Sequence, residues 1–336
     1  MGLSAVRVGY ATVVAITTVG LIAGCGSNDS DTPDVATVTP ATAAPAPVTG
    51  VKPPAGQVIP LPAGGRDVAV DGSGRTLAVL SADGRQVWLK TVSEITAPPR
   101  AVDAGTLTRI IARPGEGFVG VGPRTLVLIG ADGAVTKHAI GVTEPRSVAS
   151  LESGHLLVGS ASGHVVEFDA DGKQIRDIDG LVRADDIAVH GDQIVVLDRA
   201  QSSVTQLKLA ENELGLSLRV GNGATTLISD HYGRFISANT RDNEVVGFFG
   251  DPLVMRFRGA VSDGPYALAY DDKSNLLWVS VTGRNEVVAY DLGSGETIEK
   301  KRISTVAQPD SIAFDQTTGT LYVVSATGGG LAVVGR

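Results

Sequence analysis

From about residue 66 to the C-terminus, the chain repeats one sequence pattern seven times, with a period of about 40 residues. Each copy centres on an apolar pair that ends in a small or aliphatic residue: Val68-Ala69, Ile111-Ala112, Val148-Ala149, Ile187-Ala188, Leu227-Ile228, Leu268-Ala269 and Ile312-Ala313. The last residues of successive pairs are 43, 37, 39, 40, 41 and 44 residues apart. Such a period, filled with short strands and Gly/Asp turns, is typical of a β-propeller. We therefore predict an all-β chain folded as a seven-bladed β-propeller.

The sixth repeat shows what one copy contains. Four strand-like stretches, residues 265–270, 276–281, 286–291 and 297–303, alternate with turns rich in Gly, Asp, Ser and Asn. The second stretch is continuously apolar, which is typical of a strand that is buried on both faces. The other copies follow the same order, so we predict up to four short strands in each blade.

The last repeat is one strand short. It supplies three strand-like stretches, residues 311–314, 320–325 and 331–334, and then the chain ends. An open ring would leave unpaired strand edges, which proteins avoid. The strand-like residues 57–61 precede the first repeat, and their Pro60 suits an outermost strand, where one side needs no donors. We predict that residues 57–61 form the outer strand of the seventh blade and close the ring.

Two copies carry a recognisable repeat phrase. Residues 265–271 read Pro-Tyr-Ala-Leu-Ala-Tyr-Asp and precede Leu277-Trp278-Val279, and residues 309–315 read Pro-Asp-Ser-Ile-Ala-Phe-Asp and precede Leu321-Tyr322-Val323. These phrases resemble the YVTN and NHL-type propeller repeats, in which a Pro, an apolar-Ala-apolar-Asp stretch, a turn and Leu-Tyr-Val follow one another. The resemblance implies the fold and carries no specific activity.

The N-terminus has the features of a secretory signal. Arg7 precedes an uncharged stretch, residues 8–24, which ends in Leu21-Ile22-Ala23-Gly24 before Cys25. This ending resembles the lipobox of bacterial lipoproteins, in which the Cys becomes the diacylglyceryl-modified first residue of the mature chain. The resemblance implies removal of residues 1–24 and a lipid anchor at Cys25 on the extracytoplasmic face of the cell membrane. The alternatives are an ordinary signal peptide or a membrane helix with a chance Cys.

The stretch after Cys25 has the composition of a linker. It is rich in Pro, Thr and Ala and shows no apolar periodicity, so we predict a disordered tether over residues 25–55 and the propeller over residues 56–336. Cys25 is the only Cys, so the predicted domain has no disulfide and no thiolate metal site. Together with the Ala/Gly/Val-rich composition, these features resemble propeller lipoproteins of the actinobacterial cell envelope.

Charge and motifs argue against several functional classes. The formal net charge is −8 and no long basic stripe is present, which is untypical of nucleic-acid binding. No Gly-x-Ser-x-Gly elbow, Walker loop or EF-hand occurs. No two histidines have metal-ligand spacing among His138, His155, His164, His190 and His231. We therefore expect neither a cofactor nor a metal.

Polar residues at the predicted channel mouth are the candidates for an enzymatic site. Propeller lactonases assemble their sites around the central channel from one residue per blade. The positions that would face this channel mouth are Asp67, Glu144, Asp185, Asp186, Asn239 and Asp310. The alternative, which we favour, is that these residues cap turns and pair with nearby arginines. We retain Asp67, Asp185 and Asp310 as candidate ligand contacts.

A basic residue recurs in the loop between the second and third strands of six repeats. These residues are Arg85, Arg124, His164, Arg199, Arg241 and Arg284, whereas the seventh repeat has Gly328-Gly329-Gly330. Four further arginines precede first strands on the same predicted face: Arg66, Arg109, Arg146 and Arg183. Guanidinium groups suit carboxylates and phosphates, so one hypothesis is a rim that binds an anionic envelope glycan or lipid head group. The alternative, which we favour, is a solvated rim neutralised by acidic residues in the same loops.

These observations favour a non-catalytic, membrane-tethered module that binds a ligand or protein partner, or acts as a scaffold, at the cell envelope. The alternative is a lactonase-like or other hydrolase with its site at the channel mouth. Carboxylate and Asn side chains converging in the channel would favour the enzyme, whereas a salt-bridged or apolar channel would favour the binding module. A subunit of another envelope complex would show an exposed apolar patch.

Overall fold

The computed structural model of the protein describes residues 1–2, 36–115 and 117–335. Residues 3–24 of the predicted signal peptide, Cys25 and the first part of the predicted tether lie outside these ranges. Among the described residues, no helix is long and apolar enough to cross a membrane. Ala36–Arg336 forms one compact unit.

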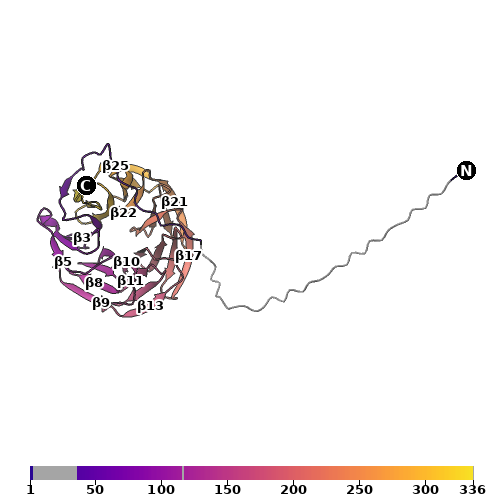
Figure 1. The fold of residues 1–336 in the computed structure, drawn as a ribbon, viewed down its shortest axis with the longest axis horizontal. Helices are drawn as coiled ribbons and strands as arrows, with labels where there is room; N and C mark the ends of the chain where they lie inside the picture. Colours follow the sequence, from indigo (N-terminus) through magenta and orange to yellow (C-terminus); the bar gives the residue numbers. More distant parts are fainter. Residues whose placement is uncertain (3–35, 116, 336) are drawn as a thin grey trace. The chain divides into compact units, whose positions relative to one another are not determined.

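Within the described residues, the strands form seven four-stranded antiparallel sheets, which are the blades of one ring (Figure 1). Blades 1 to 3 contain β2 (Gly65–Val70), β3 (Thr76–Ser81), β4 (Val87–Thr91) and β5 (Arg100–Val102); β6 (Arg109–Ala112), β7 (Phe118–Gly122), β8 (Thr125–Ile129) and β9 (Val135–Ala139); and β10 (Pro145–Ser150), β11 (Leu156–Ser160), β12 (Val165–Phe168) and β13 (Gln174–Ile178). Blades 4 to 6 contain β14 (Asp186–His190), β15 (Gln193–Asp198), β16 (Ser203–Lys208) and β17 (Glu213–Arg219); β18 (Ala224–Ser229), β19 (Phe235–Asn239), β20 (Glu244–Phe249) and β21 (Val254–Ala260); and β22 (Pro265–Asp271), β23 (Leu276–Val281), β24 (Glu286–Asp291) and β25 (Ile298–Ser304). Blade 7 contains β26 (Pro309–Asp315), β27 (Thr320–Ser325), β28 (Leu331–Val334) and β1 (Gln57–Ile59), and the short 3₁₀ helices are η1 (Val92–Glu94) and η2 (Thr282–Arg284).

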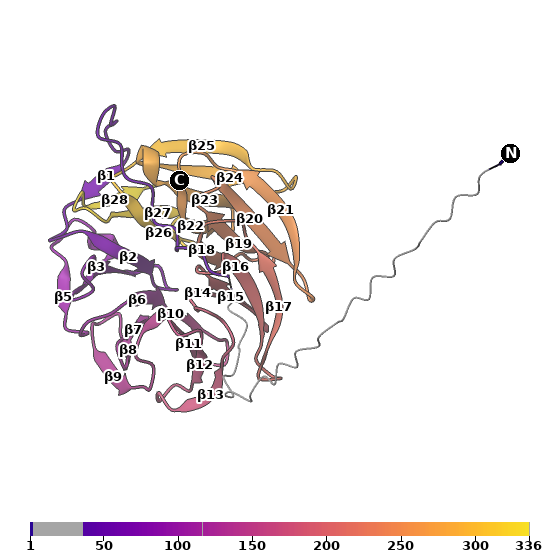
Figure 2. The same cartoon turned by 45° about the vertical axis from the view of Figure 1, so that its right-hand side comes forward.

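The ring is closed by the strand that precedes the first repeat. β1 pairs antiparallel with β28, and Gln57 lies opposite Val333 while Ile59 lies opposite Leu331. Figure 2 shows indigo β1 beside yellow β28, so the two ends of the propeller meet in one sheet. The predicted seven-bladed ring and its closing strand are therefore confirmed, although the strand ends at Ile59, before Pro60 and Pro62. A proline lacks the N–H that a ladder hydrogen bond needs.

The core lies between neighbouring blades and consists of aliphatic and small side chains. β3 is buried at every position, as its continuous apolar pattern requires. Its Leu77 and Val79 belong to one cluster with Tyr322 and Val324 of blade 7, so blades 1 and 7 share a core layer. The same contact between blades recurs around the ring and buries both faces of the second strands.

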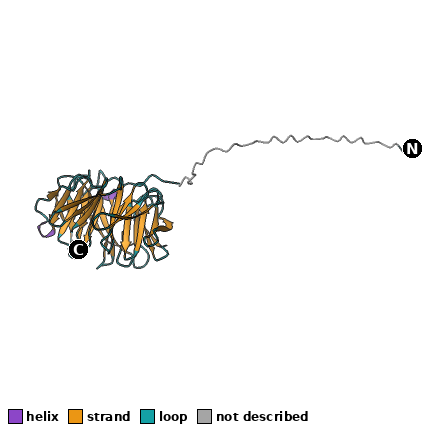
Figure 3. Ribbon diagram, turned by 90° about the horizontal axis from the view of Figure 1, so that it is seen from below, coloured by secondary structure: helices purple, strands orange, loops and turns teal. Residues whose placement is uncertain are grey.

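The first strands lie nearest the axis of the ring. Each of β2, β6, β10, β14, β18, β22 and β26 contacts the first strand of the next blade. The strands run between two faces that carry the loops (Figure 3). One face carries the starts of the first strands together with the loops between second and third strands, and we call it the mouth face.

The register of blade 2 differs by one residue from the sequence alignment. Asp67 lies opposite Leu80, one residue before the end of β3, and Arg109 lies opposite Val121, one residue before the end of β7. Arg109 is therefore the equivalent of Asp67, and Ile110-Ile111, rather than Ile111-Ala112, is the apolar pair of this blade. The run Ile110-Ile111-Ala112 fits either alignment by hydrophobicity, so sequence alone could not choose.

A local irregularity at the start of the first strands brings adjacent side chains toward the channel. The pairing with the second strand shifts at this point in five blades of the described ring, between Gly65 and Asp67, Pro145 and Ser147, Ala224 and Thr226, Pro265 and Leu268, and Pro309 and Ser311. A bulge interrupts the strict alternation of side chains between the two faces of a strand. As a result, both Arg66 and Asp67 line the central cavity.

Residues 38–46, which we call the strap, lie against the mouth face. The Val38 N–H donates to the Ala200 carbonyl of blade 4 (2.6 Å), and the Ala46 N–H donates to Gln308 Oε1 of blade 7 (2.9 Å). Ala41 is buried, with 5% of its surface exposed. This part of the predicted tether is therefore held on the propeller and differs from the disordered chain that its composition predicts. Its partners are polar groups of blades 4 to 7, which a composition analysis of the segment alone does not see.

Candidate ligand site at the channel mouth

The centre of the ring holds a cavity of about 620 Å³, lined mainly by the first strands. Two sets of equivalent positions face it, one residue apart along each first strand. The outer ring, nearer the mouth, consists of Arg66, Thr108, Arg146, Asp185, Thr225, Tyr266 and Asp310, and all seven residues line the cavity. The inner ring consists of Asp67, Arg109, Ser147, Asp186, Thr226, Ala267 and Ser311, of which all but Ser147 line it.

The inner ring holds neighbouring blades together. Asp67 Oδ2 accepts a hydrogen bond from the Ile110 N–H of blade 2 (3.1 Å). Asp186 Oδ2 accepts one from the Leu227 N–H of blade 5 (3.1 Å), and Ser311 Oγ accepts one from the Val68 N–H of blade 1 (3.1 Å). In each case the acceptor bonds the residue that follows the inner-ring position of the next blade. These side chains therefore satisfy main-chain donors at the joints between blades.

Arg109 joins two inner-ring carboxylates across the channel. Its Nη1 lies 3.2 Å from Asp67 Oδ1 of blade 1, and its Nη2 lies 3.5 Å from Asp186 Oδ1 of blade 4. Asp67 and then Asp186 raise the pKa of the Arg109 guanidinium. Burial raises the pKa of the Asp186 carboxyl, and the charge of Arg109 opposes this effect. This arrangement, the Asp67–Arg109–Asp186 triad, leaves the two carboxylates already partnered.

The outer-ring carboxylates are also engaged. Asp185 lies 2.5 Å from Arg183 Nη2 and accepts the Arg199 N–H at 3.0 Å, and only 3% of its side chain is exposed. Asp310 accepts a hydrogen bond from Gln308 Nε2 at 2.8 Å. Burial raises the pKa of Asp310, while this hydrogen bond lowers it by less. Blade 4 and blade 7 thus each supply one carboxylate whose geometry is set by a neighbour on the same blade.

Three arginines at the mouth have no carboxylate partner among the described residues. Arg66 and Arg146 are exposed and occupy equivalent outer-ring positions in blades 1 and 3. No described group forms a hydrogen bond or ion pair with either side chain. Arg199 Nε is buried without a hydrogen-bond partner, while Arg199 Nη2 donates to the Ala41 carbonyl of the strap. A buried donor without an acceptor is costly, so Arg199 marks a position where an acceptor on a ligand would be stabilising.

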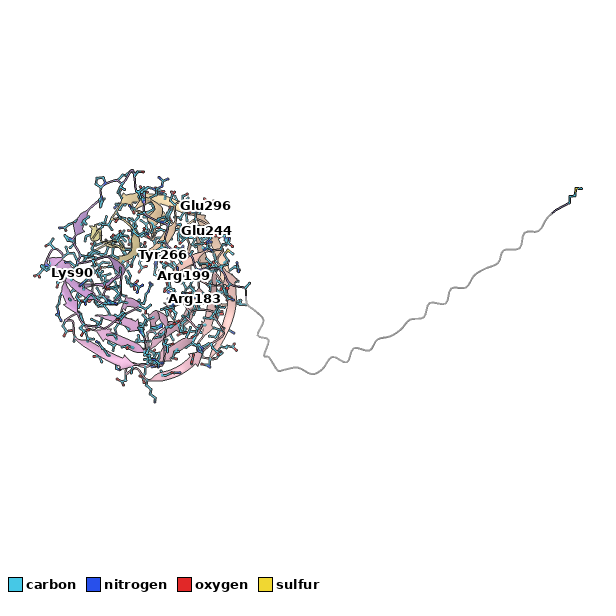
Figure 4. The ribbon with its side chains drawn as sticks, in the orientation of Figure 1. Lys90, Arg183, Arg199, Glu244, Tyr266 and Glu296 are labelled. Carbon is cyan, nitrogen blue, oxygen red and sulfur yellow. The ribbon has the colours of Figure 1, made fainter. Side chains whose placement is uncertain are left out.

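The labelled side chains of Figure 4 illustrate this arrangement. Arg183, Arg199 and Tyr266 lie beside the central opening, whereas Lys90 and Glu296 lie away from it. The cavity wall thus presents cations and a phenol ring toward the axis. Below the two polar rings, the wall is formed by small and aliphatic side chains such as Ala69, Ile111 and Ile228.

Four of the candidate residues from the sequence line the cavity: Asp67, Asp185, Asp310 and Arg199. The other five, Arg85, Arg124, His164, Arg241 and Arg284, do not. The loops between second and third strands lie farther from the axis than the first strands do, so the predicted basic rim does not converge on the channel. Among the basic residues of these loops, only Arg199 of blade 4 lines the cavity, and the loops of blades 1 and 7 contribute Ala82 and Ala326.

Most of the outlying basic residues have local partners. His164 Nδ1 lies 2.8 Å from Asp177 Oδ1, and Arg284 Nε lies 3.0 Å from Asp263 Oδ2. Arg241 donates to the main-chain carbonyls of Asn222 and Thr39. Arg85 and Arg124 are exposed. The alternative of locally neutralised, solvated side chains therefore describes most of this set.

The remaining candidate positions from the sequence also divide into those that line the cavity and those that do not. Asp186 belongs to the triad, whereas Glu144 and Asn239 do not line the cavity. Asn239 Nδ2 donates to Glu244 Oε1 (2.7 Å) and Asp242 Oδ2 (2.8 Å), which fixes the turn after β19. Over residues 36–115 and 117–335, no group of three or more His, Cys, Asp or Glu side chains has an arrangement suited to a metal ion.

Sequence reasoning missed the polar neutral residues of the outer ring, Thr108, Thr225 and Tyr266. It also gave Arg66 and Arg146 less weight than the loop arginines. A signal was present, because each outer-ring residue lies two positions before the apolar pair of its repeat once blade 2 is aligned correctly. What the signal could not provide is the bulge that directs this position toward the channel.

Large apolar side chains are exposed at one outer edge of the ring. Phe249 and Val254 face each other across β20 and β21, with 39% and 38% of their surfaces exposed, and Met255 follows with 46%. This edge of blade 5 is the place that the protein-partner hypothesis would use.

Comparison with known proteins supports the fold but identifies no family. No protein-family model matches the chain, and no curated protein matches it by sequence. Among solved structures, a hydrazine synthase chain from Kuenenia stuttgartiensis aligns with a TM-score of 0.70 at 12% identity, covering 85% of this chain and 99% of the other. A streptogramin B lyase structure aligns with a TM-score of 0.68 at 11% identity, covering 82% and 96%.

The chain is a seven-bladed β-propeller. At these identities the likeness extends to the arrangement of the strands and not to the side chains of a site. The two similar structures are named for different chemistries, so they do not choose between a binding module and an enzyme.

Proposed function

We propose that the protein is a lipid-anchored β-propeller of the YVTN/NHL type on the extracytoplasmic face of the cell membrane, where its channel mouth binds an anionic ligand without catalysis. The observation that carries this proposal is the set of three mouth arginines, Arg66, Arg146 and Arg199, that have no carboxylate partner among the described residues. The ligand class is a compact molecule or head group that carries phosphate or carboxylate groups.

The chemistry of the mouth fits this ligand class. A guanidinium group offers a planar set of donors that matches carboxylate and phosphate oxygens. The cavity of about 620 Å³ falls within the usual range for small-molecule sites. The outer ring also presents a hydroxyl from Thr108 and a phenol from Tyr266, which can bind further oxygens of the same ligand.

The carboxylates support binding over hydrolysis. Asp67 and Asp186 bond the main chain of the next blade and share Arg109, and Asp185 is held by Arg183. A general base or nucleophile needs a carboxylate that is free to reach the substrate. The three carboxylates are therefore already bonded within the chain. A channel lined by such salt-bridged groups supports a binding module.

One observation favours the hydrolase as a second candidate. Asp310 lines the cavity in the blade next to Tyr266, and burial raises the pKa of its carboxyl, as is common for a general acid. If this candidate is right, Asp310→Asn abolishes hydrolysis of lactone or ester substrates while leaving their binding intact. If the binding module is right, the wild-type protein hydrolyses none of them.

The lipid anchor is tested separately from the site. Cells that express the protein are fed an alkyne-labelled palmitate, and the label is expected in the mature chain. Cys25→Ser is expected to remove the label and to release the protein from the membrane fraction. A labelled Cys25→Ser protein would contradict the anchor.

The site is tested by calorimetric titration with pyrophosphate and with citrate at low ionic strength. We expect the double variant Arg66→Gln/Arg146→Gln to weaken binding by at least about tenfold, because each charge-assisted hydrogen bond contributes about 1.5–3 kcal/mol. The matched control is Arg124→Gln/Arg284→Gln, which removes the same charge from the same face outside the cavity. Equal losses in the two double variants would indicate a general charge effect and would overturn the proposed site.

A further inference from the structure

The strap runs along one half of the channel mouth, from blades 4 and 5 at its start to blade 7 at its end. Val38 bonds blade 4, Thr39 accepts from Arg241 of blade 5, and Ala46 bonds Gln308 of blade 7. Between these points, the Ala44 carbonyl accepts a hydrogen bond from Gln308 Nε2 at 3.1 Å. The strap thus contacts the half of the mouth that blades 4 to 7 form.

The strap engages groups that belong to the candidate site. Arg199 lines the cavity and donates its Nη2 to the Ala41 carbonyl, so the strap uses a guanidinium that the proposed ligand would use. Gln308 holds Ala44 and Ala46 and also donates to Asp310 of the outer ring. A carbonyl oxygen is a weaker partner for a guanidinium than a phosphate or carboxylate oxygen.

The attachment of the strap is lighter than that of a strand. The strap has no strand pairing, and most of its residues are at least partly exposed, with Ala41 as the buried exception. Ala44 lies close to blade 6 because Gly264 has no side chain there; a Cβ on Gly264 would lie 2.6 Å from the Ala44 Cβ. A handful of hydrogen bonds, each contributing about 1 kcal/mol, can be broken and formed again without unfolding a blade.

We propose that the strap is a reversible cover that limits access to Arg199, and that an anionic ligand and the strap compete for this side chain. The competition rests on the proposed anion-binding function, whereas the cover does not. The ligand binds best when the strap is detached.

The test uses the full-length protein with three single substitutions. Ala41→Phe and Ala44→Phe place a ring where the strap meets blades 4 to 6, and both are expected to detach it. Thr42→Phe is the matched control, because Thr42 lies in the same segment and is exposed. Circular dichroism and thermal unfolding verify that the propeller is intact in each variant.

Two measurements follow the strap and the ligand independently. The first is the rate at which phenylglyoxal modifies Arg199, read by peptide mass spectrometry, together with hydrogen exchange at the Val38 and Ala46 amides. The second is the Kd for pyrophosphate. If the strap is open for about a tenth of the time, its detachment lowers the Kd by about tenfold.

The expected result is faster modification of Arg199 and a lower Kd in Ala41→Phe and Ala44→Phe, with Thr42→Phe unchanged. Saturating pyrophosphate is expected to speed exchange at the strap amides of the wild type. Wild-type rates of Arg199 modification in both strap variants would overturn the cover. Faster modification in proteins that bind no pyrophosphate would support the cover and refute the anion-binding function.

Discussion

The two halves of the channel mouth differ in how their charged side chains are partnered. In the half formed by blades 4 to 7, charged groups are paired within the chain, as in Arg183 with Asp185 and Arg199 with the strap. In the half formed by blades 1 to 3, Arg66 and Arg146 are exposed without a partner among the described residues, and Arg109 alone is held by carboxylates. The charged groups of the mouth are thus paired in one half, whereas Arg66 and Arg146 are exposed in the other.

The inner and outer rings also differ in what their side chains bond. The inner ring is occupied by interblade hydrogen bonds and the triad, so it serves the fold. Among the described residues, the outer ring has exposed, unpaired arginines in blades 1 and 3, whereas the strap lies on the loops of blades 4 to 7. Substitutions in the outer ring can therefore change the chemistry of the mouth without disturbing the joints between blades.

The largest expected effect comes from removing the cation of the triad. Arg109→Met leaves Asp186 buried without its ion pair, and we expect a loss of about 3 kcal/mol in the free energy of unfolding at pH 7. Arg183→Met is the counterpart in the covered half and should cost less, because Asp185 keeps the Arg199 N–H. Denaturant unfolding of both variants measures the difference.

The pH dependence of the Arg109→Met variant provides a control. Burial already raises the pKa of Asp186, and loss of Arg109 raises it further. A carboxyl with a raised pKa in the folded state destabilises the protein above its ordinary pKa of 3.8, and the penalty disappears as the pH falls below that value. A loss that stays constant from pH 7 to pH 4 would contradict the electrostatic explanation.

An intermediate effect tests the interblade hydrogen bond of the open half. Ser311 performs in blade 7 the task that Asp67 performs in blade 1, so a serine at position 67 should keep the bond to the Ile110 N–H. We expect Asp67→Ser to be more stable than Asp67→Ala by about 1 kcal/mol, the contribution of one hydrogen bond. The midpoints of denaturant unfolding give this comparison directly, and identical midpoints would refute the role of the bond.

The smallest expected effect concerns the covered half. Burial raises the pKa of Asp310, so its ionised carboxylate lowers stability at neutral pH. Asp310→Asn should raise the melting temperature at pH 7 by about 1–2 °C, because the amide can still accept from Gln308. The gain should shrink as the pH falls from neutral and vanish below the ordinary value of 3.8, where the wild-type carboxyl is protonated in both states. An advantage that grows in acid would show that Asp310 is stabilised, not penalised, by its surroundings.

The repeat pattern predicted the architecture well for a physical reason. Each copy carries its own strand periodicity and turn residues, so seven local signals agree, and the orphan strand near Gln57 has one free edge to pair with. The candidate site was predicted less well. Asp67, Asp185, Asp310 and Arg199 reach the cavity, whereas Arg124 and Arg284 share the predicted face but not the channel.

By itself, the sequence determined the all-β class, the number of blades, the closing strand and the face on which polar residues gather, because these follow from local periodicity. Only the tertiary structure decided which of these residues meet. It turned the position of Arg66 inward through a bulge, joined Arg109 to carboxylates of blades 1 and 4, and laid residues 38–46 across blades 4 to 7. These contacts link segments far apart in the chain, so no local pattern encodes them.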